Sequence, residues 1–322
     1  MKPLCLQGFT WLALAVAAVP VEAQTWPTRP IRAIVPIAAG SLTDIVPRLV
    51  LEQLSTQLGQ RIVVENRPGA GSTLGTAAAA KAAPDGYTVL VNSSAHTVAP
   101  SLYANLDYDP ARDFVAVAPL GVSPFVLVAP PARGFRTAGE LVAAAKAKPG
   151  TFNFSSPGIG TASHLSAERF RLSAGVQASH VPFKGGSEAL TEVMTGRVDF
   201  FFVALGAALP LIQEGAVTAL AVNDVKRSAA LPDVPTTAEA GFANAEYPTW
   251  FGLFVPARTP REIIDRLQRE TVMALQAPNV QEKLRTIGVD PAPMVPGAFG
   301  AYVEKQIAAD AALVALTKIK AE

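Results

Sequence analysis

The chain has 322 residues, of which 50% are hydrophobic and 16% are charged, and its 27 Lys and Arg residues nearly balance its 26 Asp and Glu residues. This apolar content excludes an intrinsically disordered chain. The formal net charge of +1 lacks the basic excess that nucleic-acid binding requires, so we expect no nucleic-acid partner. The length suffices for one large globular unit or for two lobes.

The N-terminus has the pattern of a secretory signal peptide. Lys2 supplies a short basic region, residues 9–19 supply an apolar one, and residues 21–23 form a small-residue cleavage site. We therefore predict a signal peptide over residues 1–23, cleaved near Ala23, and a periplasmic location. A buried helix or a membrane anchor is the alternative, which the shortness of the apolar segment disfavours.

The rest of the chain is expected to be a soluble protein without disulfides. No later stretch reaches the ~18 uninterrupted apolar residues of a membrane span. The one cysteine, Cys5, lies before the apolar region and would be removed with the signal peptide. A mature chain of this size can be held together by its hydrophobic core alone.

Short β-rich runs alternate with helical patterns along the chain, which indicates an α/β fold. Residues 31–37 are predicted as a strand, 43–58 as an amphipathic helix and 61–65 as a strand parallel to the first. Further strands are expected at 87–92, 114–119, 125–129, 152–155, 178–181, 198–203, 219–222 and 251–255. Further helices are expected at 138–148, 163–172, 187–195 and 260–274.

Two stretches rich in Pro and Gly, at 119–131 and 231–248, interrupt this alternation. They predict two crossings between two lobes. The first lobe would comprise residues 24–121 and 250–322, and the second 122–249. Ligands of such sheets bind outside the carboxyl ends of the strands, so we expect a site between the lobes.

Two segments have the composition of an anion-binding loop. Residues 35–44 lead from a strand into a helix through small residues that allow close backbone approach, and the helix N-terminus offers unpaired N–H groups. Residues 152–164 repeat this pattern in the second lobe. Two such anion cradles, one in each lobe, suit a carboxylate ligand. The alternative is that both are ordinary loops, because such loops commonly end in Ser, Thr or Asp.

Eight segments, taken in order, resemble the Bug-type extracytoplasmic solute-binding receptors of tripartite tricarboxylate transporters. They are WPTRPIR at 26–32, VPIAAGSLTD at 35–44, VENRPGAG at 64–71, APDGYT at 83–88, GTASH at 160–164, HVPFKG at 180–185, PTTAEAG at 235–241 and WFGLF at 250–254. Each segment alone is a weak signal, but their common order is specific.

The resemblance implies a type II periplasmic-binding-protein fold, in which two α/β lobes close on a small organic acid in a cleft between them. It implies binding without catalysis, no cofactor and no metal, a monomer, and delivery of the ligand to membrane transporter subunits or to a membrane sensor. The positions carried over to the first cradle are Ala38, Ala39, Gly40, Ser41, Leu42 and Thr43. Those carried over to the second are Ser155, Ser156, Gly158, Thr161 and Ser163.

Other residues are expected around these cradles. Asp44 is expected to cap and orient its own loop, since its carboxylate would repel an anionic ligand. The first lobe is expected to contribute Ser93, Ser94 and His96 to the cleft. In the second lobe, Phe183 is a candidate wall of the cleft or a core residue, and Lys184 either contacts a carboxylate or is solvated.

Three positions depart from the pattern of the resembled family. Ser41 stands where a second glycine is usual, Leu42 adds an apolar wall, and Val203 stands where an acidic residue is common. These differences favour a ligand with an apolar or aromatic body over a plain tricarboxylate.

Competing functions are less well supported. The glycines at 69, 71 and 75 depart from a dinucleotide fingerprint and instead predict a tight turn into an alanine-rich helix. An exported α/β enzyme, such as a hydrolase acting on a small carboxylate or ester, is the main alternative. It would need a base and a nucleophile in contact, and His96, His164 and His180 are far apart in sequence. The effector-binding part of a transcription regulator is disfavoured by the signal peptide.

Overall fold

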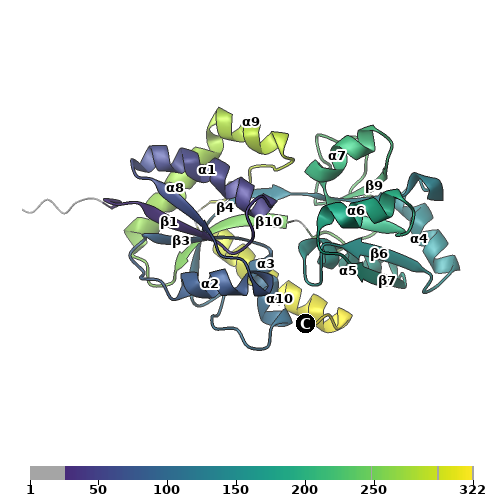
Figure 1. The fold of residues 1–322 in the computed structure, drawn as a ribbon, viewed down its shortest axis with the longest axis horizontal. Coiled ribbons are helices and arrows are strands. Elements are labelled where there is room, and N and C mark those ends of the chain that lie inside the picture. Colours follow the sequence, from purple (N-terminus) through teal and green to yellow (C-terminus); the bar gives the residue numbers. More distant parts are fainter. Residues whose placement is uncertain (1–25, 248, 296, 321–322) are drawn as a thin grey trace, which may run out of the picture.

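The computed structural model describes residues 26–247, 249–295 and 297–320, so the predicted signal peptide lies outside the described residues. Within them, the strands form two five-stranded sheets, in the orders β2-β1-β3-β10-β4 and β7-β6-β8-β5-β9. Figure 1 shows the two sheets and their helices as neighbouring bodies. We call residues 26–123 and 249–320 the first lobe, and residues 124–247 the second lobe.

The first sheet is built on the predicted strand–helix–strand unit. Its strands, in chain order, are β1 (Ile31–Val35), β2 (Ile62–Asn66), β3 (Thr88–Ser93), β4 (Phe114–Ser123) and β10 (Thr249–Pro256). β1 pairs in parallel with both β2 and β3, whereas β10 runs antiparallel between β3 and β4. Helix α1 (Leu42–Leu58) connects β1 to β2 and buries Val46, Val50 and Leu54 in the core of this lobe.

The other helices of the first lobe confirm two predictions, the helix expected at 260–274 and the tight turn at 69–75, and add elements that the sequence patterns did not assign. They are η1 (Ala70–Ser72), α2 (Thr73–Ala80), α3 (Ala95–Leu102), α8 (Arg261–Gln276), α9 (Pro278–Thr286) and α10 (Ala298–Thr317). The tight turn into an alanine-rich helix is present as η1 and α2. Helices α3, α9 and α10 were not predicted.

Strand β4 corrects the prediction that a strand ends at Pro119. The strand continues to Ser123, and its register with β10 shifts between Phe251, opposite Gly121, and Gly252, opposite Pro119. A proline has no N–H to donate, so within sheets it is confined to edges and bulges. β4 is the edge strand of its sheet and Pro119 lies at its bulge, where the missing donor is tolerated.

The second lobe repeats the α/β pattern around a core rich in phenylalanine. Its elements are β5 (Phe125–Ala129), η2 (Pro131–Arg133), α4 (Ala138–Ala147), β6 (Phe152–Ser156), α5 (Ala162–Ala174), β7 (Ala178–Pro182), α6 (Gly186–Met194), β8 (Phe200–Ala204), α7 (Leu205–Gln213) and β9 (Thr218–Asn223). β6 pairs in parallel with β7 and β8, and β5 runs antiparallel to β8 and β9. Phe154, Phe170, Phe200 and Phe202 are fully buried in its core.

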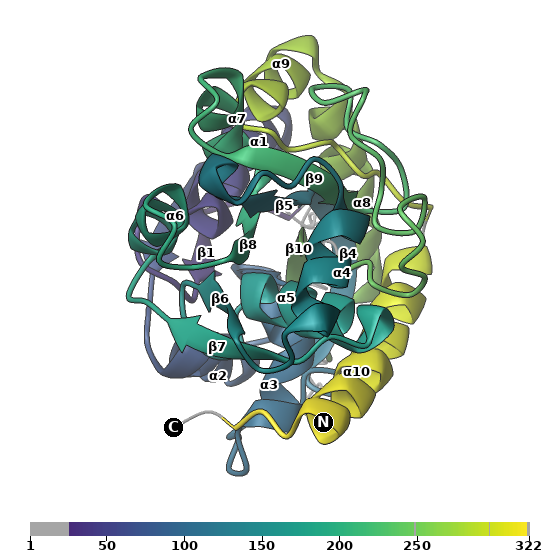
Figure 2. The ribbon, with the colours of Figure 1, turned by 90° about the vertical axis from the view of Figure 1, so that its right-hand side faces the viewer.

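The lobes are joined by two crossings and also touch through side chains. The chain passes from the first sheet to the second at Pro124 and returns between β9 and β10. An apolar cluster joins Val98 of α3 and Leu313 of α10 to Leu165 of α5 in the second lobe. Figure 2, in which the second lobe faces the viewer, shows α10 running along one side of the molecule. The lobe boundaries at 121/122 and 249/250 stay predictions of where independent units divide.

Candidate functional site

The first cradle is the loop between β1 and α1, and Asp44 holds it in shape. The Asp44 carboxylate accepts hydrogen bonds from Gly40 N at 2.9 Å, from Arg48 Nε at 2.9 Å and from Asn66 Nδ2 at 2.8 Å. Ser41 occupies the N-cap position, but its hydroxyl donates to Ala38 O rather than capping the helix. These contacts confirm that Asp44 orients its own loop.

The same contacts keep Asp44 ionised. Burial alone would raise its pKa, but the hydrogen bonds from Arg48, Gly40 and Asn66 together lower the pKa below its usual value. The carboxylate is therefore satisfied by its own loop. The first N–H groups of a helix have no acceptor within the helix. At the start of α1 the Asp44 N–H already donates to Ser41 O at 2.9 Å, so the N–H groups of Leu42 and Thr43 are the ones that can face a ligand. Figure 1 shows this end of α1 directed toward the second lobe.

The predicted residues of the first cradle differ in exposure. Ala38, Ala39 and Gly40 are exposed, Ser41 and Leu42 are half-buried, and Thr43 is buried. Leu42 packs against the core of the first lobe, which places part of its side chain away from any ligand. The surface of this cradle is thus made largely of backbone and methyl groups.

The second cradle is the loop between β6 and α5. Thr161 is the N-cap of α5, and its hydroxyl accepts from His164 N at 3.4 Å. Gly158 O accepts from the hydroxyls of Thr161 at 2.8 Å and Ser156 at 2.9 Å. Gly160 adopts a φ of 74°, and a Cβ placed there would lie 2.3 Å from Leu102 Cδ1 of the first lobe. The second cradle therefore packs directly against the first lobe.

Two predicted serines of this cradle direct their hydroxyls into the lobe. Ser155 Oγ donates to Ala189 O at 3.3 Å, and Ser163 Oγ donates to Phe202 O at 2.6 Å. Both residues are buried. Their hydroxyls therefore hold the loop and helix in place. The main chain of Ser155 is paired with β7 and β8 within the sheet, so of these two residues only Ser163, in the first turn of α5, can turn a backbone N–H toward a ligand.

Two histidines of this region, far apart in sequence, are in contact. The rings of His164 and His180 stack with their centroids 3.8 Å apart, and His180 Nε2 lies 2.6 Å from Ser156 Oγ. Burial, His180 and Arg171 lower the pKa of His164 to about 3, and burial lowers that of His180 to about 4. Sequence reasoning missed this contact, although each histidine lies in one of the matched segments.

The structure places His96 in the core of the first lobe rather than at the cradles. Its side chain is fully buried, 4.5 Å from Phe254 and 5.3 Å from Phe114 between ring centroids. Burial lowers the pKa of His96 to about 4. This placement does not support the prediction that His96 lines the site. Ser93 and Ser94, just before it, are also buried.

The remaining candidates lie at the rim of the second lobe or inside it. Phe183 is half-buried and packs against a core cluster, and its N–H donates to Ser156 O at 2.9 Å. Lys184 is exposed, with its backbone N–H donating to Glu188. Val203 is 4% exposed and belongs to the same core cluster, so its side chain is packed within the lobe.

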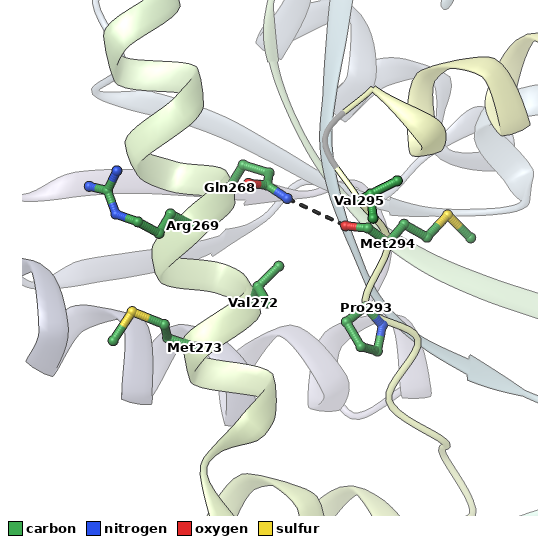
Figure 3. A pocket seen from close by; sticks show the side chains of 7 residues that line it. All are labelled: Gln268, Arg269, Val272, Met273, Pro293, Met294 and Val295. Atoms are coloured by element: carbon green, nitrogen blue, oxygen red, sulfur yellow. Dashed lines mark hydrogen bonds between the residues drawn. The ribbon is translucent and has the colours of Figure 1, made fainter.

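Two apolar pockets lie away from the cradle loops. One of about 390 Å³ lies between α8 and the segment 293–295, where Gln268 donates to Met294 O (Figure 3). Another of about 360 Å³ lies between α5 and α10, where the two lobes meet. Neither contains a predicted site residue.

Two further features are absent from the described residues. No helix in this part of the chain combines the length and hydropathy of a membrane span. In the same residues, no group of three or more His, Asp or Glu side chains is arranged to hold a metal ion.

Two α/β lobes joined by two crossings, with a loop of small residues leading into a helix in each, have the architecture of the two-lobed solute-binding proteins. The model of the tripartite tricarboxylate transporter family receptor matches residues 46–317. The chain therefore belongs to this receptor family. The protein BugT of Bordetella pertussis is 36% identical over 312 residues, which cover 96% of each chain.

Solved structures of other proteins also match this chain over nearly its whole length. An R. palustris protein solved with adipate matches with a TM-score of 0.80 and 32% identity, covering 92% of this chain and 100% of the other. MatC from Rhodopseudomonas palustris with bound malate matches with a TM-score of 0.75 and 32% identity, covering 90% of this chain and 100% of the other. The two-lobed periplasmic-binding-protein fold expected from the sequence is thus confirmed.

Proposed function

We propose that this chain is a periplasmic receptor that binds a small organic carboxylate between its two cradles and delivers it to a membrane transporter. One observation carries the proposal: each lobe presents the N-terminus of a long helix, α1 or α5, behind a loop of small residues. A helix N-terminus carries about half a positive charge and N–H groups without intrahelical acceptors, which suits a carboxylate.

The side chains around the cradles favour backbone recognition of the carboxylate. The Asp44 carboxylate and the hydroxyls of Ser155 and Ser163 are already engaged in internal hydrogen bonds. Besides the exposed side chain of Lys184, the donors that stay available include the backbone N–H groups at the starts of α1 and α5. A ligand held by both would bridge the lobes and shift the equilibrium toward the closed form, because an anion contacts both cradles only in that form.

The nature of the ligand beyond its carboxylate follows from the residues beside the cradles. Ala38 and Ala39 are exposed in the first, and Ile159 is 39% exposed in the second. These groups suit an apolar chain or ring more than a second and third carboxylate. The related structures hold the dicarboxylates adipate and malate. We therefore propose a mono- or dicarboxylate with an apolar or aromatic body, without catalysis or cofactor.

A hydrolase is the second candidate, because Ser156 Oγ and His180 Nε2 are 2.6 Å apart. Two features disfavour it. Ser156 is fully buried, and its hydroxyl is also within hydrogen-bond distance of Gly158 N and Gly158 O. A ring whose pKa lies near 4 is a weak general base at neutral pH. Release of nitrophenol from short-chain nitrophenyl esters at a rate abolished by Ser156→Ala would favour the hydrolase.

A thermal-shift screen of the chain from Gln24 tests the receptor. The panel contains mono-, di-, tri- and aromatic carboxylates, with amino acids and sugars as controls. A ligand at ~100 times its Kd adds about 2.7 kcal/mol to the free energy of unfolding, which raises Tm measurably. Saturable stabilisation by one class of acid, without turnover of that acid, is expected. No stabilisation by any acid, with protein stripped of copurified ligand by unfolding and refolding, would contradict the proposal.

A further inference from the structure

The second cradle is braced by an aromatic stack that its sequence does not reveal. His164 lies in the first turn of α5, and His180 lies on β7 beside Phe154 of β6 in the parallel register. The His164 and His180 planes are 12° apart, and Phe154 stacks on His180 with centroids 5.0 Å apart. The two imidazoles thus come from different elements and converge on the loop 157–161.

His180 is connected to this loop through Ser156. The Ser156 hydroxyl lies 2.9 Å from Gly158 O, 3.1 Å from Gly158 N and 2.6 Å from His180 Nε2. A serine hydroxyl has one proton to donate and two lone pairs to accept with. Gly158 O can only accept and Gly158 N can only donate. All three contacts are satisfied when His180 donates from Nε2, which is the neutral Nε2–H tautomer.

His164 is connected to the same loop directly. Its Nδ1 accepts a hydrogen bond from Gly160 N at 3.1 Å, so Nδ1 carries no proton and the ring proton is on Nε2. Nε2 lies 3.9 Å from Glu168 Oε1. Protonation of His164 at Nδ1 would remove the bond to Gly160. Burial and the neighbouring ring hold the pKa of His164 near 3, which keeps this acceptor available at neutral pH.

We propose that His164 and His180 are positioning residues for ligand binding: the stacked neutral pair fixes the Gly158–Gly160 turn, and with it the direction of the N–H groups at the start of α5. This inference rests on the proposed function. Both imidazoles act through the loop backbone and need not touch the ligand. Gly158 and Gly160 have φ values of 135° and 74°. Glycine adopts such values readily but does not favour them over others, so the shape of the turn depends on its hydrogen bonds to neighbouring residues.

Isosteric substitutions separate this role from simple packing. Asn places an oxygen where His164 has Nδ1, and Gln places an amide nitrogen where His180 has Nε2. We expect His164→Leu and His180→Leu to weaken the binding of adipate or malate by about tenfold, the effect of one lost hydrogen bond. His164→Asn and His180→Gln should stay within about threefold of the unsubstituted chain. His96→Leu, a buried histidine away from the loop, is the matched control.

Titration calorimetry with adipate and malate gives the affinities, and ¹⁵N spectra of the imidazoles report the tautomers without any ligand. If the unsubstituted chain binds the acid, two results would overturn the inference and leave the proposed receptor function intact. One is an equal loss of affinity in the isosteric and leucine variants, and the other is unchanged affinity in the leucine variants. An Nδ1–H tautomer at His164 would overturn it even if a leucine variant failed to fold. Absence of binding of adipate, malate and every other acid of the thermal-shift panel to the unsubstituted chain would instead refute the proposed function, and the positioning role with it.

Discussion

Gly206 and Gly288 pack backbone against backbone between the two lobes. A Cβ on Gly288 would lie 2.9 Å from Gly206 Cα, and a Cβ on Gly206 would lie 2.5 Å from Ile287 O. The contact adjoins the first crossing, because Ser123 Oγ donates to Gly288 O and Leu205 N donates to Pro124 O. The separation of the lobes at this point is therefore set by main chain, which cannot move aside as a flexible side chain can.

Gly206→Ala is expected to push the lobes apart at this contact. The added Cβ meets a carbonyl oxygen of the other lobe, so one lobe must shift relative to the other. We expect the free energy of unfolding to fall by about 1–3 kcal/mol, as in overpacked interiors, and the ligand affinity to fall as well. Denaturant unfolding, solution scattering and calorimetry measure the three effects. Gly300→Ala, on α10 with open space around it, is the control that should lose neither stability nor affinity.

Asp44→Asn is expected to loosen the first cradle. The substitution removes the charge that binds Arg48 and replaces one acceptor oxygen with a donor, leaving hydrogen bonds to Gly40 or Asn66 unmade. We expect a loss of about 1–3 kcal/mol in unfolding free energy, together with weaker ligand binding. Asp265→Asn, in the exposed Arg261–Asp265 pair, is the matched control with an effect below about 1 kcal/mol. Equal effects in the two variants would show that Asp44 does not hold the loop.

His96→Leu is expected to leave ligand affinity unchanged, because the ring is enclosed by Phe114 and Phe254. Neither ring nitrogen makes a well-formed hydrogen bond within the described residues. Replacing such a buried polar group with an apolar one of similar size is nearly neutral or stabilising. Unfolding at neutral pH and calorimetry with the best acid test this. A clear loss of ligand affinity in a variant whose free energy of unfolding is unchanged would show that His96 contributes to the ligand site.

The free energy of unfolding is expected to fall as pH falls from about 6.5 toward 4. His96 and His164 have pKa values of about 4 and 3 in the folded chain, so below the usual histidine value of 6.5 only the unfolded chain gains their protons. Each such histidine contributes up to about 1.4 kcal/mol per pH unit.

Protonation of Asp310 opposes this fall in the free energy of unfolding at low pH. Burial raises its pKa to about 6, so between pH 6 and its unfolded value of 3.8 the folded chain holds the extra proton. Asp310 accepts from Thr97 Oγ1 at 2.7 Å and Gln306 Nε2 at 3.1 Å. Asp310→Asn should therefore give a steeper loss of stability between pH 6 and 4 than the unsubstituted chain, as measured by urea unfolding at several pH values. A shallower slope in that variant would refute the assignment.

The sequence predicted the elements with strong local patterns. The unit of β1, α1 and β2 was predicted because alternating and helical periodicities are clear there, and the two cradles were predicted because small residues follow each strand. Helices α3 and α7 were not assigned, since they span only 8 and 9 residues and each contains a proline, Pro100 or Pro210. Helix α1 also contains a proline, Pro47, but its 17 residues are long enough for the apolar periodicity to remain clear.

The contact between His164 and His180 could not be predicted from local pattern. It depends on the register of β6 and β7, which sets His180 beside Phe154, and on the direction in which α5 leaves the cradle. Both are properties of the assembled sheet. The burial of His96 is similarly long-range, because Phe114 and Phe254 come from β4 and β10.

Amide NMR of the ¹⁵N-labelled chain, during titration with the acid that gives the largest thermal shift, tests most directly whether both lobes hold the ligand. We expect the backbone N–H resonances of Leu42 and Thr43, at the start of α1, and of Ala162 and Ser163, at the start of α5, to move together with a single Kd. Movement confined to one cradle, or to residues outside both, would contradict the claim that one carboxylate ligand is held by both lobes.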